Sequence, residues 1–346
     1  MSEDPEIAAA DQIAKAQKLL TSLGYDAGPA DGVFGPRSAA AIRAFQKDQH
    51  IAESGKLTRS LLARLAAARA KLPRDTLLRY ETGEVFVYSD GSSETVKDAG
   101  DVTRLVSSSG EETQQQENFL NLAGAGESSD APDDFLQPLR PGSKGDYRLR
   151  DGGTDGQTES ISSVSCAVGH AGRTTAPAGR FKTIDVFCTQ TTSGAPVIIR
   201  EWDYAAALHQ PVRETVKRGG KISVQRELVA IRPGTAMWPA AARSGFDWAV
   251  VNALNDAGKG GPAVAWTSTG VSESFSIRVD PAPVKPAPPL PGMDGTGTCL
   301  RYRLERTDPA GAGQIYPGLA CRTDDGQWRI PARQSIAFEA PPKGLE

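Results

Sequence analysis

Residues 16–46, AQKLLTSLGYDAGPADGVFGPRSAAAIRAFQ, predict two amphipathic helices joined by a glycine-rich loop. Four apolar residues of the first helix recur at the three- and four-residue spacing that places them on one helical face: Ala16, Leu19, Leu20 and Leu23. Gly24 follows directly, where a helix commonly ends in a left-handed residue. Gly35-Pro36 marks the start of the second helix, because proline is tolerated in a first helical turn.

The second helix carries its own apolar stripe of Ala41, Ile42 and Phe45. A third helix is predicted over residues 57–70, with leucines at positions 61, 62 and 65 and Thr58 as its N-cap. Three short amphipathic helices in one segment predict a small bundle at residues 1–72, with the leucines, Ile42 and Phe45 in its core.

This segment resembles the three-helix peptidoglycan-binding domain found on many bacterial cell-wall hydrolases. The resemblance covers residues 8–70, and Ser38 stands where the family usually has threonine. It implies non-covalent attachment to the cell wall. The matching residues are Gln17, Leu20, Leu23-Gly24-Tyr25, Gly28, Asp31-Gly32, Phe34-Gly35, Ala41-Ile42 and Phe45-Gln46.

Five residues of this module form the predicted peptidoglycan-binding site: Tyr25, Asp31, Phe34, Arg37 and Gln46. Tyr25, Arg37 and Gln46 combine reach with hydrogen-bonding groups, so they are candidates for contacting the glycan or the stem peptide. Asp31 has a structural alternative, since it can close an Asx turn. The glycines at 28, 32 and 35 are expected to meet backbone demands rather than to touch a ligand.

Composition bounds the partners and the location. The net charge of −3 comes without a sustained basic block, which argues against a nucleic-acid partner, and no apolar run reaches the length of a membrane helix. The N-terminus, MSEDPEIAAADQ, lacks a signal-peptide layout and taken literally indicates the cytoplasm. Peptidoglycan lies outside the inner membrane, so we expect an exported chain in the periplasm or at the cell surface, with its signal removed or upstream.

Four cysteines at 166, 188, 299 and 321 support export. They allow three pairings, of which neighbour with neighbour is the simplest, and free buried thiols are the alternative. No CxxC or Cys/His spacing indicates a zinc site, and no other metal or cofactor motif is present.

The rest of the chain alternates as β-strands do. Residues 75–123 predict a small β-meander or barrel-like unit, with a hairpin turn at Asp90-Gly91. Residues 124–145 have the composition of a solvated linker. Residues 146–280 predict a β-sandwich-like domain. The proline-rich residues 281–297 predict a second linker, followed by a small β module at 298–331 and a tail at 332–346.

The large β unit contains Trp202, Trp238, Trp248 and Trp266, which indicate either a sandwich core or a sugar-stacking surface. The last module is similar to the C-terminal end of outer-membrane surface-antigen lipoproteins. The matching residues are Cys299 to Tyr302, Gly318 to Arg322 and Asp325 to Ile330. This resemblance implies location in the envelope, but the lipid-bearing N-terminal cysteine of those lipoproteins is missing.

A catalytic site does not emerge from the sequence. The chain has three histidines, at 50, 170 and 209, and none has HxxxD or HExxH spacing. Cys166 and His170 do not match an L,D-transpeptidase context. The predicted fold class is multi-domain and mainly β: a three-helix bundle, a β-meander, a β-sandwich-like domain and a disulfide-stapled C-terminal β module.

The predicted function is a non-enzymatic envelope protein that binds peptidoglycan and presents β domains for structural contacts or to another envelope protein. Two alternatives remain open. One is a peptidoglycan-remodelling enzyme with an unrecognised catalytic site in residues 146–280, and the other is a secreted adhesin or toxin-like factor.

Overall fold

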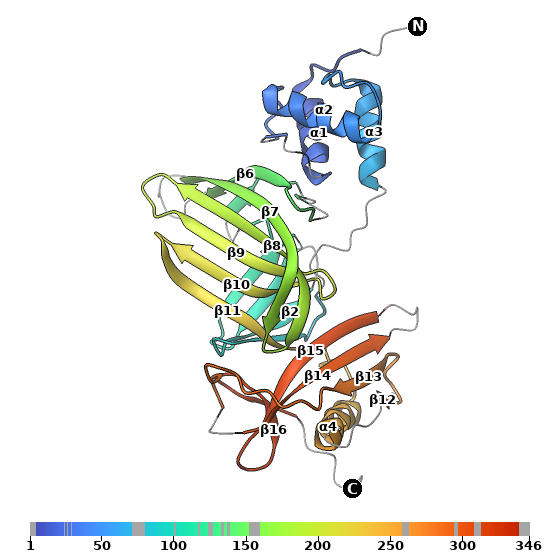
Figure 1. The fold of residues 1–346 in the computed structure, drawn as a ribbon, viewed down its shortest axis with the longest axis vertical. Coiled ribbons are helices and arrows are strands. Elements are labelled where there is room, and N and C mark those ends of the chain that lie inside the picture. The colour runs from blue at the N-terminus through green and yellow to red at the C-terminus, as the bar shows by residue number, and fades with distance from the viewer. Residues whose placement is uncertain are drawn as a thin grey trace.

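A computed structural model describes residues 5–23, 25, 27–28, 30–70, 80–99, 102–116, 118–123, 127–132, 135–136, 139–151, 160–257, 263–293, 297–307 and 313–338. The chain runs from a helical domain at one end, through a strongly curved sheet, to a second group of strands covered by a helix (Figure 1). The predicted fold class, multi-domain and mainly β with an N-terminal three-helix bundle, is confirmed.

The three predicted helices are present as α1 (Ala10–Ser22), α2 (Pro36–Asp48) and α3 (Arg59–Ala70). Their apolar faces meet in one core that includes Leu20, Ile42, Phe45 and Leu65, each at most 1% exposed. The backbone N–H of Leu61 donates to the Thr58 hydroxyl at 3.3 Å, as the predicted N-cap requires. Gly24 lies outside the described residues.

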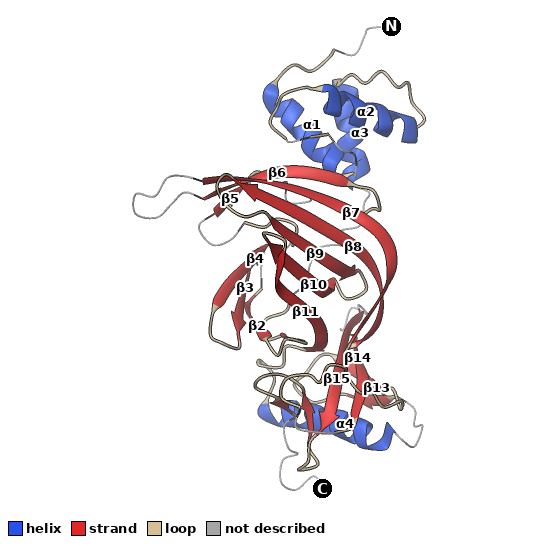
Figure 2. Cartoon of the chain, turned by 60° about the vertical axis from the view of Figure 1, so that its left-hand side comes forward, coloured by secondary structure: helices blue, strands red, loops and turns tan. Residues whose placement is uncertain are grey.

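The curved sheet is one antiparallel ladder in the order β5-β6-β7-β8-β9-β10-β11-β1-β2-β3-β4 (Figure 2). Its strands are β1 (Val85–Tyr88), β2 (Ser93–Asp98), β3 (Val102–Ser107), β4 (Glu112–Gln116), β5 (Glu127–Ser129), β6 (Lys144–Asp151), β7 (Ser160–Ala176), β8 (Gly179–Thr192), β9 (Ile198–Ala205), β10 (Gln210–Arg218) and β11 (Lys221–Arg232).

A second ladder contains β12 (Val264–Trp266), β13 (Ser274–Val279), β14 (Cys299–Thr307), β15 (Gly313–Arg322), β16 (Trp328–Ile330) and β17 (Ile336–Ala337). It joins the first ladder where Ala230 of β11 pairs with Gly318 of β15. The helix α4 (Ala240–Asp256) packs on this second ladder through Phe246, Val250 and Leu254.

The division of the β part differs from the one the sequence predicts. The strands of residues 75–123 extend the large sheet through the β1–β11 pairing and do not form a separate barrel-like unit. The predicted boundary at residue 280 falls inside a ladder, because β13 before it pairs with β14 after it. Residues 76–79, predicted as strand, lie outside the described residues, as does the tail beyond 338.

Both predicted linkers contribute to the cores. In residues 124–145, Phe135, Leu136 and Leu139 are buried under the concave face of the sheet, and β5 pairs with β6. In residues 281–297, Leu290 is buried and Val284 bridges to Cys299. A few large apolar residues are enough to anchor a polar or proline-rich segment in a core. Overall composition does not show this, because these residues are a small fraction of the segment.

Each cysteine forms a disulfide with its neighbour in the sequence, Cys166 with Cys188 and Cys299 with Cys321, which is the simplest of the predicted pairings. Each pair lies directly opposite across two neighbouring antiparallel strands, with Cα–Cα distances of 4.1 and 3.9 Å. Cys166 is therefore not available as a nucleophile for His170.

Three of the four tryptophans belong to cores. Trp202 lies in the core under the concave sheet, and Trp238 stacks on Trp266 with ring centroids 5.3 Å apart in the core shared by the two ladders. Trp248, on α4, is 38% exposed. The four therefore do not share one sugar-stacking surface.

Gly318 marks the crossing point of the two ladders. It pairs with Tyr302 of β14 and with Ala230 of β11, and a Cβ atom at position 318 would lie 2.2 Å from the Tyr302 ring. The aromatic ring thus covers the glycine, and no side chain fits beneath it.

We expect Gly318→Ala to lower the free energy of unfolding by about 1–3 kcal/mol, because the buried Tyr302 ring must move. Urea unfolding measures the change. Gly313→Ala on the same strand is the matched control, since a Cβ atom there would lie 3.6 Å from the Arg306 carbonyl oxygen, an ordinary van der Waals contact. Equal stability of the two variants would contradict the close packing at Gly318.

Glu84 is a carboxyl buried between β1 and β15. It is fully buried and accepts hydrogen bonds from the Glu81 backbone N–H at 2.9 Å and from Gln314 Nε2 at 3.1 Å. The pKa of Glu84 is raised to about 8, chiefly by burial and also by the neighbouring Glu81 carboxylate, whereas the Glu81 backbone N–H and Arg306 act to lower it. Arg306 itself is ion-paired with Glu81.

Stability should therefore fall as pH rises from about 4.5 to about 8, because the unfolded carboxyl ionises in this window while the folded one stays protonated. Glu84→Gln has no carboxyl to ionise at this position and so lacks this dependence. Its free energy of unfolding should therefore rise relative to that of wild type between about pH 4.5 and 8, by an amount on the order of a few kcal/mol. Thermal unfolding at several pH values measures it, with the exposed Glu111→Gln as control. A constant difference between Glu84→Gln and wild type would contradict the raised pKa.

Candidate functional site

The loop between α1 and α2 is held by one buried side chain, Gln17, which is 2% exposed. Its Nε2 donates to the carbonyl of Val33 at 3.0 Å and to Ser38 Oγ at 3.2 Å, and its Oε1 accepts from the Gly32 N–H at 3.0 Å. Gly32 has a φ of +76°, and a Cβ there would lie 2.7 Å from the Ala10 carbonyl oxygen, so only glycine fits. One glutamine thus holds residues 32 and 33 of the loop against the first turn of α2.

Replacing Gln17 with methionine should lower the stability of the helical domain by about 1–3 kcal/mol, because the buried Gly32 N–H loses its acceptor. The midpoint of thermal unfolding, followed by far-UV circular dichroism, checks this. Lys18→Met, at an exposed position one residue along the same helix, is the control. If both variants unfold at the wild-type temperature, Gln17 does not hold the loop.

Asp31, Phe34 and Arg37, three of the predicted site residues, lie in or beside the second half of this loop. Asp31 is exposed, and its Oδ1 accepts from the Val33 N–H at 2.9 Å, which is the Asx-turn geometry. Phe34 is 38% exposed next to Val33 at 67%. Arg37 is half-exposed, and its Nη2 lies 2.7 Å from Asp146 Oδ2 of β6. These side chains remain accessible to a ligand to different degrees.

Gln46 and Tyr25 lie in different surroundings. Gln46 is 4% exposed, and its amide is satisfied by the Gly55 N–H at 2.9 Å and by Ser54 Oγ at 3.0 Å, a structural arrangement. The Tyr25 hydroxyl donates to Asp48 Oδ2 at 2.7 Å, and its ring meets Phe45 edge-on at 5.7 Å. Partial burial, followed by the Asp48 hydrogen bond, raises the pKa of Tyr25.

Tyr25 borders a pocket of about 320 Å³ on the helical domain. The pocket combines apolar and basic side chains, and it is lined by Leu23, Tyr25, Phe45, Gln49, Arg64, Ala67, Ala68 and Arg140. Arg64 comes from α3, whereas Arg140 comes from the segment leading into β6. Such a pocket can hold an apolar group next to a carboxylate, because arginine binds carboxylates with two parallel hydrogen bonds.

The structure therefore brings only Tyr25, of the five predicted residues, into this pocket. Sequence reasoning missed Arg64 and Arg140. Arg64 carries a signal, since it is an exposed charged residue of the predicted third helix, but Arg140 lies far outside the resemblance and carries none.

Residues 9–65 match the family model described as "Putative peptidoglycan binding domain". These residues form a peptidoglycan-binding domain. The curated "Putative OxPP cycle protein OpcA" of Nostoc punctiforme is 42% identical over 57 residues, which are 16% of this chain and 12% of that protein. The chain thus matches about an eighth of that relative's length.

Two solved structures resemble part of this chain. One is an exported protein with a YmcC-like fold from Bacteroides fragilis, 15% identical with a TM-score of 0.26, covering 45% of this chain and 99% of that one. The other is the hypothetical lipoprotein YmcC from Escherichia coli, 7% identical with a TM-score of 0.30, covering 50% of this chain and 97% of that one.

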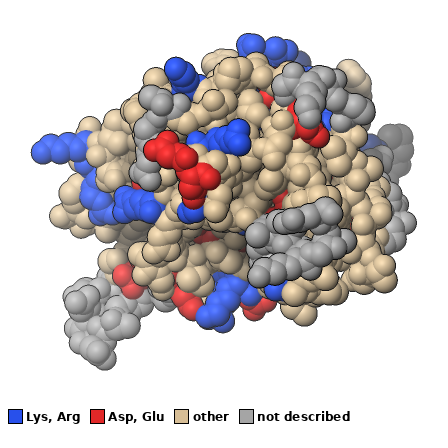
Figure 3. Space-filling view, turned by 90° about the horizontal axis from the view of Figure 1, so that it is seen from below, with Lys and Arg blue, Asp and Glu red and all other residues tan. Residues whose placement is uncertain are grey.

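Two further features bear on partners. Among the described helices, none combines the length and apolar character needed to cross a bilayer. At the end of the molecule that carries α4, Lys and Arg side chains are interspersed with Asp and Glu over the part of the surface that the structure describes (Figure 3).

Proposed function

We propose that this chain is a non-enzymatic protein of the bacterial cell envelope that attaches to peptidoglycan through its N-terminal domain. Its β part then serves structural contacts or binds another envelope protein. The observation that carries the proposal is the peptidoglycan-binding domain at residues 9–65, with an open pocket beside Tyr25.

The pocket chemistry suits the stem peptide of peptidoglycan. Stem peptides combine small apolar side chains with free carboxylates. Arg64 and Arg140 supply two cations to the pocket, and Leu23, Phe45 and the alanines of α3 supply its apolar lining. In this proposal, the Tyr25 hydroxyl, directed by Asp48, positions the aromatic ring between the two.

The location follows from the ligand. Peptidoglycan lies outside the inner membrane, so an exported chain in the periplasm or at the cell surface is part of the proposal. The two disulfides support an oxidising compartment.

A wall-remodelling enzyme is the alternative. A zymogram with purified protein in a gel containing sacculi separates the two: a cleared band would establish hydrolysis and overturn the non-enzymatic role, whereas retention on sacculi without clearing supports it.

Co-sedimentation with purified sacculi tests the wall attachment. We expect the full chain to sediment and a fragment of residues 80–346 to sediment far less completely. Arg64→Glu should weaken binding at least roughly tenfold. It removes a charged hydrogen-bond donor and places a negative charge next to the carboxylate of the ligand. Arg59→Glu, at an exposed position of the same helix outside the pocket, is the matched control.

Two results would count against this assignment. Sedimentation of the 80–346 fragment as complete as that of the full chain would remove the anchoring role of the helical domain. Equal binding by Arg64→Glu and Arg59→Glu would leave the domain as the anchor but move the contact away from the pocket, toward the loop of Phe34 and Arg37.

A further inference from the structure

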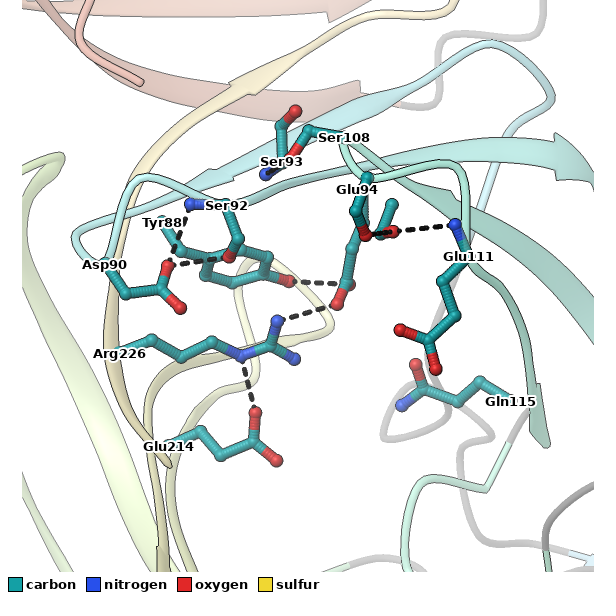
Figure 4. Close-up of polar contacts among 12 residues, drawn as sticks. Tyr88, Asp90, Ser92, Ser93, Glu94, Ser108, Glu111, Gln115, Glu214 and Arg226 are labelled. Carbon is teal, nitrogen blue, oxygen red and sulfur yellow. Dashed lines mark hydrogen bonds and ion pairs between the residues drawn. The ribbon is translucent and has the colours of Figure 1, made fainter. Parts of the chain in front are cut away.

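Charged side chains of the neighbouring strands β10 and β11 meet one from β2 around Arg226 (Figure 4). Arg226 of β11 donates from Nη1 to Glu94 Oε1 of β2 at 2.6 Å and from Nε to Glu214 Oε2 of β10 at 2.7 Å. Its guanidinium carbon lies 4.1 Å from the centroid of the Tyr88 ring. The three charged side chains are 18–21% exposed, so water reaches them only in part.

The register of the sheet positions this cluster. Trp202, Glu214 and Arg226 form one row across β9, β10 and β11, because Trp202 lies opposite Glu214 and Glu214 lies opposite Arg226. The Trp202 Nε1 donates to Glu214 Oε1 at 3.1 Å. The side chains are therefore held by ladder pairing and by one another.

These residues surround an open space, which we name the inner pocket. It has a volume of about 40 Å³ and is bordered also by Tyr80, Gln115 and Gln210. This is room for about three water molecules. Hydroxyl groups are of similar size, so the edge of a sugar ring can place its hydroxyls where the waters would lie.

Gln210 is the feature that points to a ligand. Its side chain borders the inner pocket and is 95% buried, being 5% exposed. Its Nε2 faces the Tyr80 hydroxyl but makes no hydrogen bond of ordinary geometry to a described residue. A buried donor with so poorly formed a hydrogen bond gains from a ligand that supplies a well-placed acceptor.

The charges around the inner pocket select a neutral ligand. Glu94 and Glu214 share Arg226, and Arg213 is paired with Asp203 and Glu227. An anion would meet two carboxylates, and a cation would compete with Arg226 for them. Hydroxyl groups do neither, because each both accepts from an amide and donates to a carboxylate that keeps its ion pair.

We propose that the inner pocket binds the hydroxyl edge of a neutral saccharide. Gln210 Nε2 donates to one hydroxyl oxygen, and the Glu94 and Glu214 carboxylates accept from the neighbouring hydroxyls. This site is separate from the pocket on the helical domain and does not rest on wall attachment. The saccharide is either the glycan of peptidoglycan or another polysaccharide of the envelope.

Titration calorimetry on the full chain tests the proposal, with N-acetylglucosamine oligomers in one arm and glucose oligomers in the other. We expect one arm to show binding, and the arm that does so identifies the source. Gln210→Met, which keeps the side-chain volume but removes the donor, should weaken binding roughly three- to tenfold. Gln225→Met, on the outward face of β11, should bind as wild type does.

Gln210→Asn, which keeps an amide but withdraws it by one methylene, gives a second measurement where the methionine variant does not fold. It too should bind more weakly. Heats at the level of buffer dilution in both arms would overturn the proposal. So would binding that Gln210→Asn and Gln210→Met leave unchanged, or binding that Arg64→Glu abolishes, since the saccharide would then lie on the helical domain.

Discussion

Strand β11 is the element on which the β part of the molecule depends. Its first half pairs with β10, its second half pairs with β1, and Ala230 pairs with both β1 and β15. Because β10 ends its pairing at Glu227, the same edge of β11 is free to accept β15 at Ala230. One strand thus joins β5–β10, the strands β1–β4 and the C-terminal ladder. Arg226, which borders the inner pocket, lies on β11 just before this branch point at Ala230.

The branch explains why small and buried polar residues gather next to it. Two ladders can approach at β15 only where a side chain is missing, which Gly318 provides, and the Tyr302 ring fills the space above it. Glu84, at the start of β1, is covered by the same approach and bonds to Gln314 of β15. A buried carboxyl is costly, and Glu81, Arg306 and Gln314 together offset part of that cost.

Sequence reasoning succeeded where the information is local. The three helices follow from leucine spacing, and the hairpin at Asp90-Gly91 follows from a turn residue with a φ of +83°. It missed α4, although Ala242, Phe246, Ala249 and Val250 have helical spacing, because the surrounding strands dominated the pattern. It could not predict the β1–β11 pairing, since alternation identifies a strand but not its partner. For the same reason, the position of Tyr25 on the helical domain could be predicted, whereas that of Arg140 and of the row of Trp202, Glu214 and Arg226 could not.

The two candidate sites have a simple energetic relation. The helical domain contacts β6 through the Arg37–Asp146 ion pair, whose partners are 51% and 28% exposed, and such a pair contributes at most about 1 kcal/mol. Ligand binding at one site can therefore change the affinity of the other only slightly through this contact. Two independent weak sites on one chain reinforce each other only when a single polymer reaches both, because the second contact then forms at a high effective concentration. A polymeric wall glycan meets that condition, and a small soluble saccharide does not.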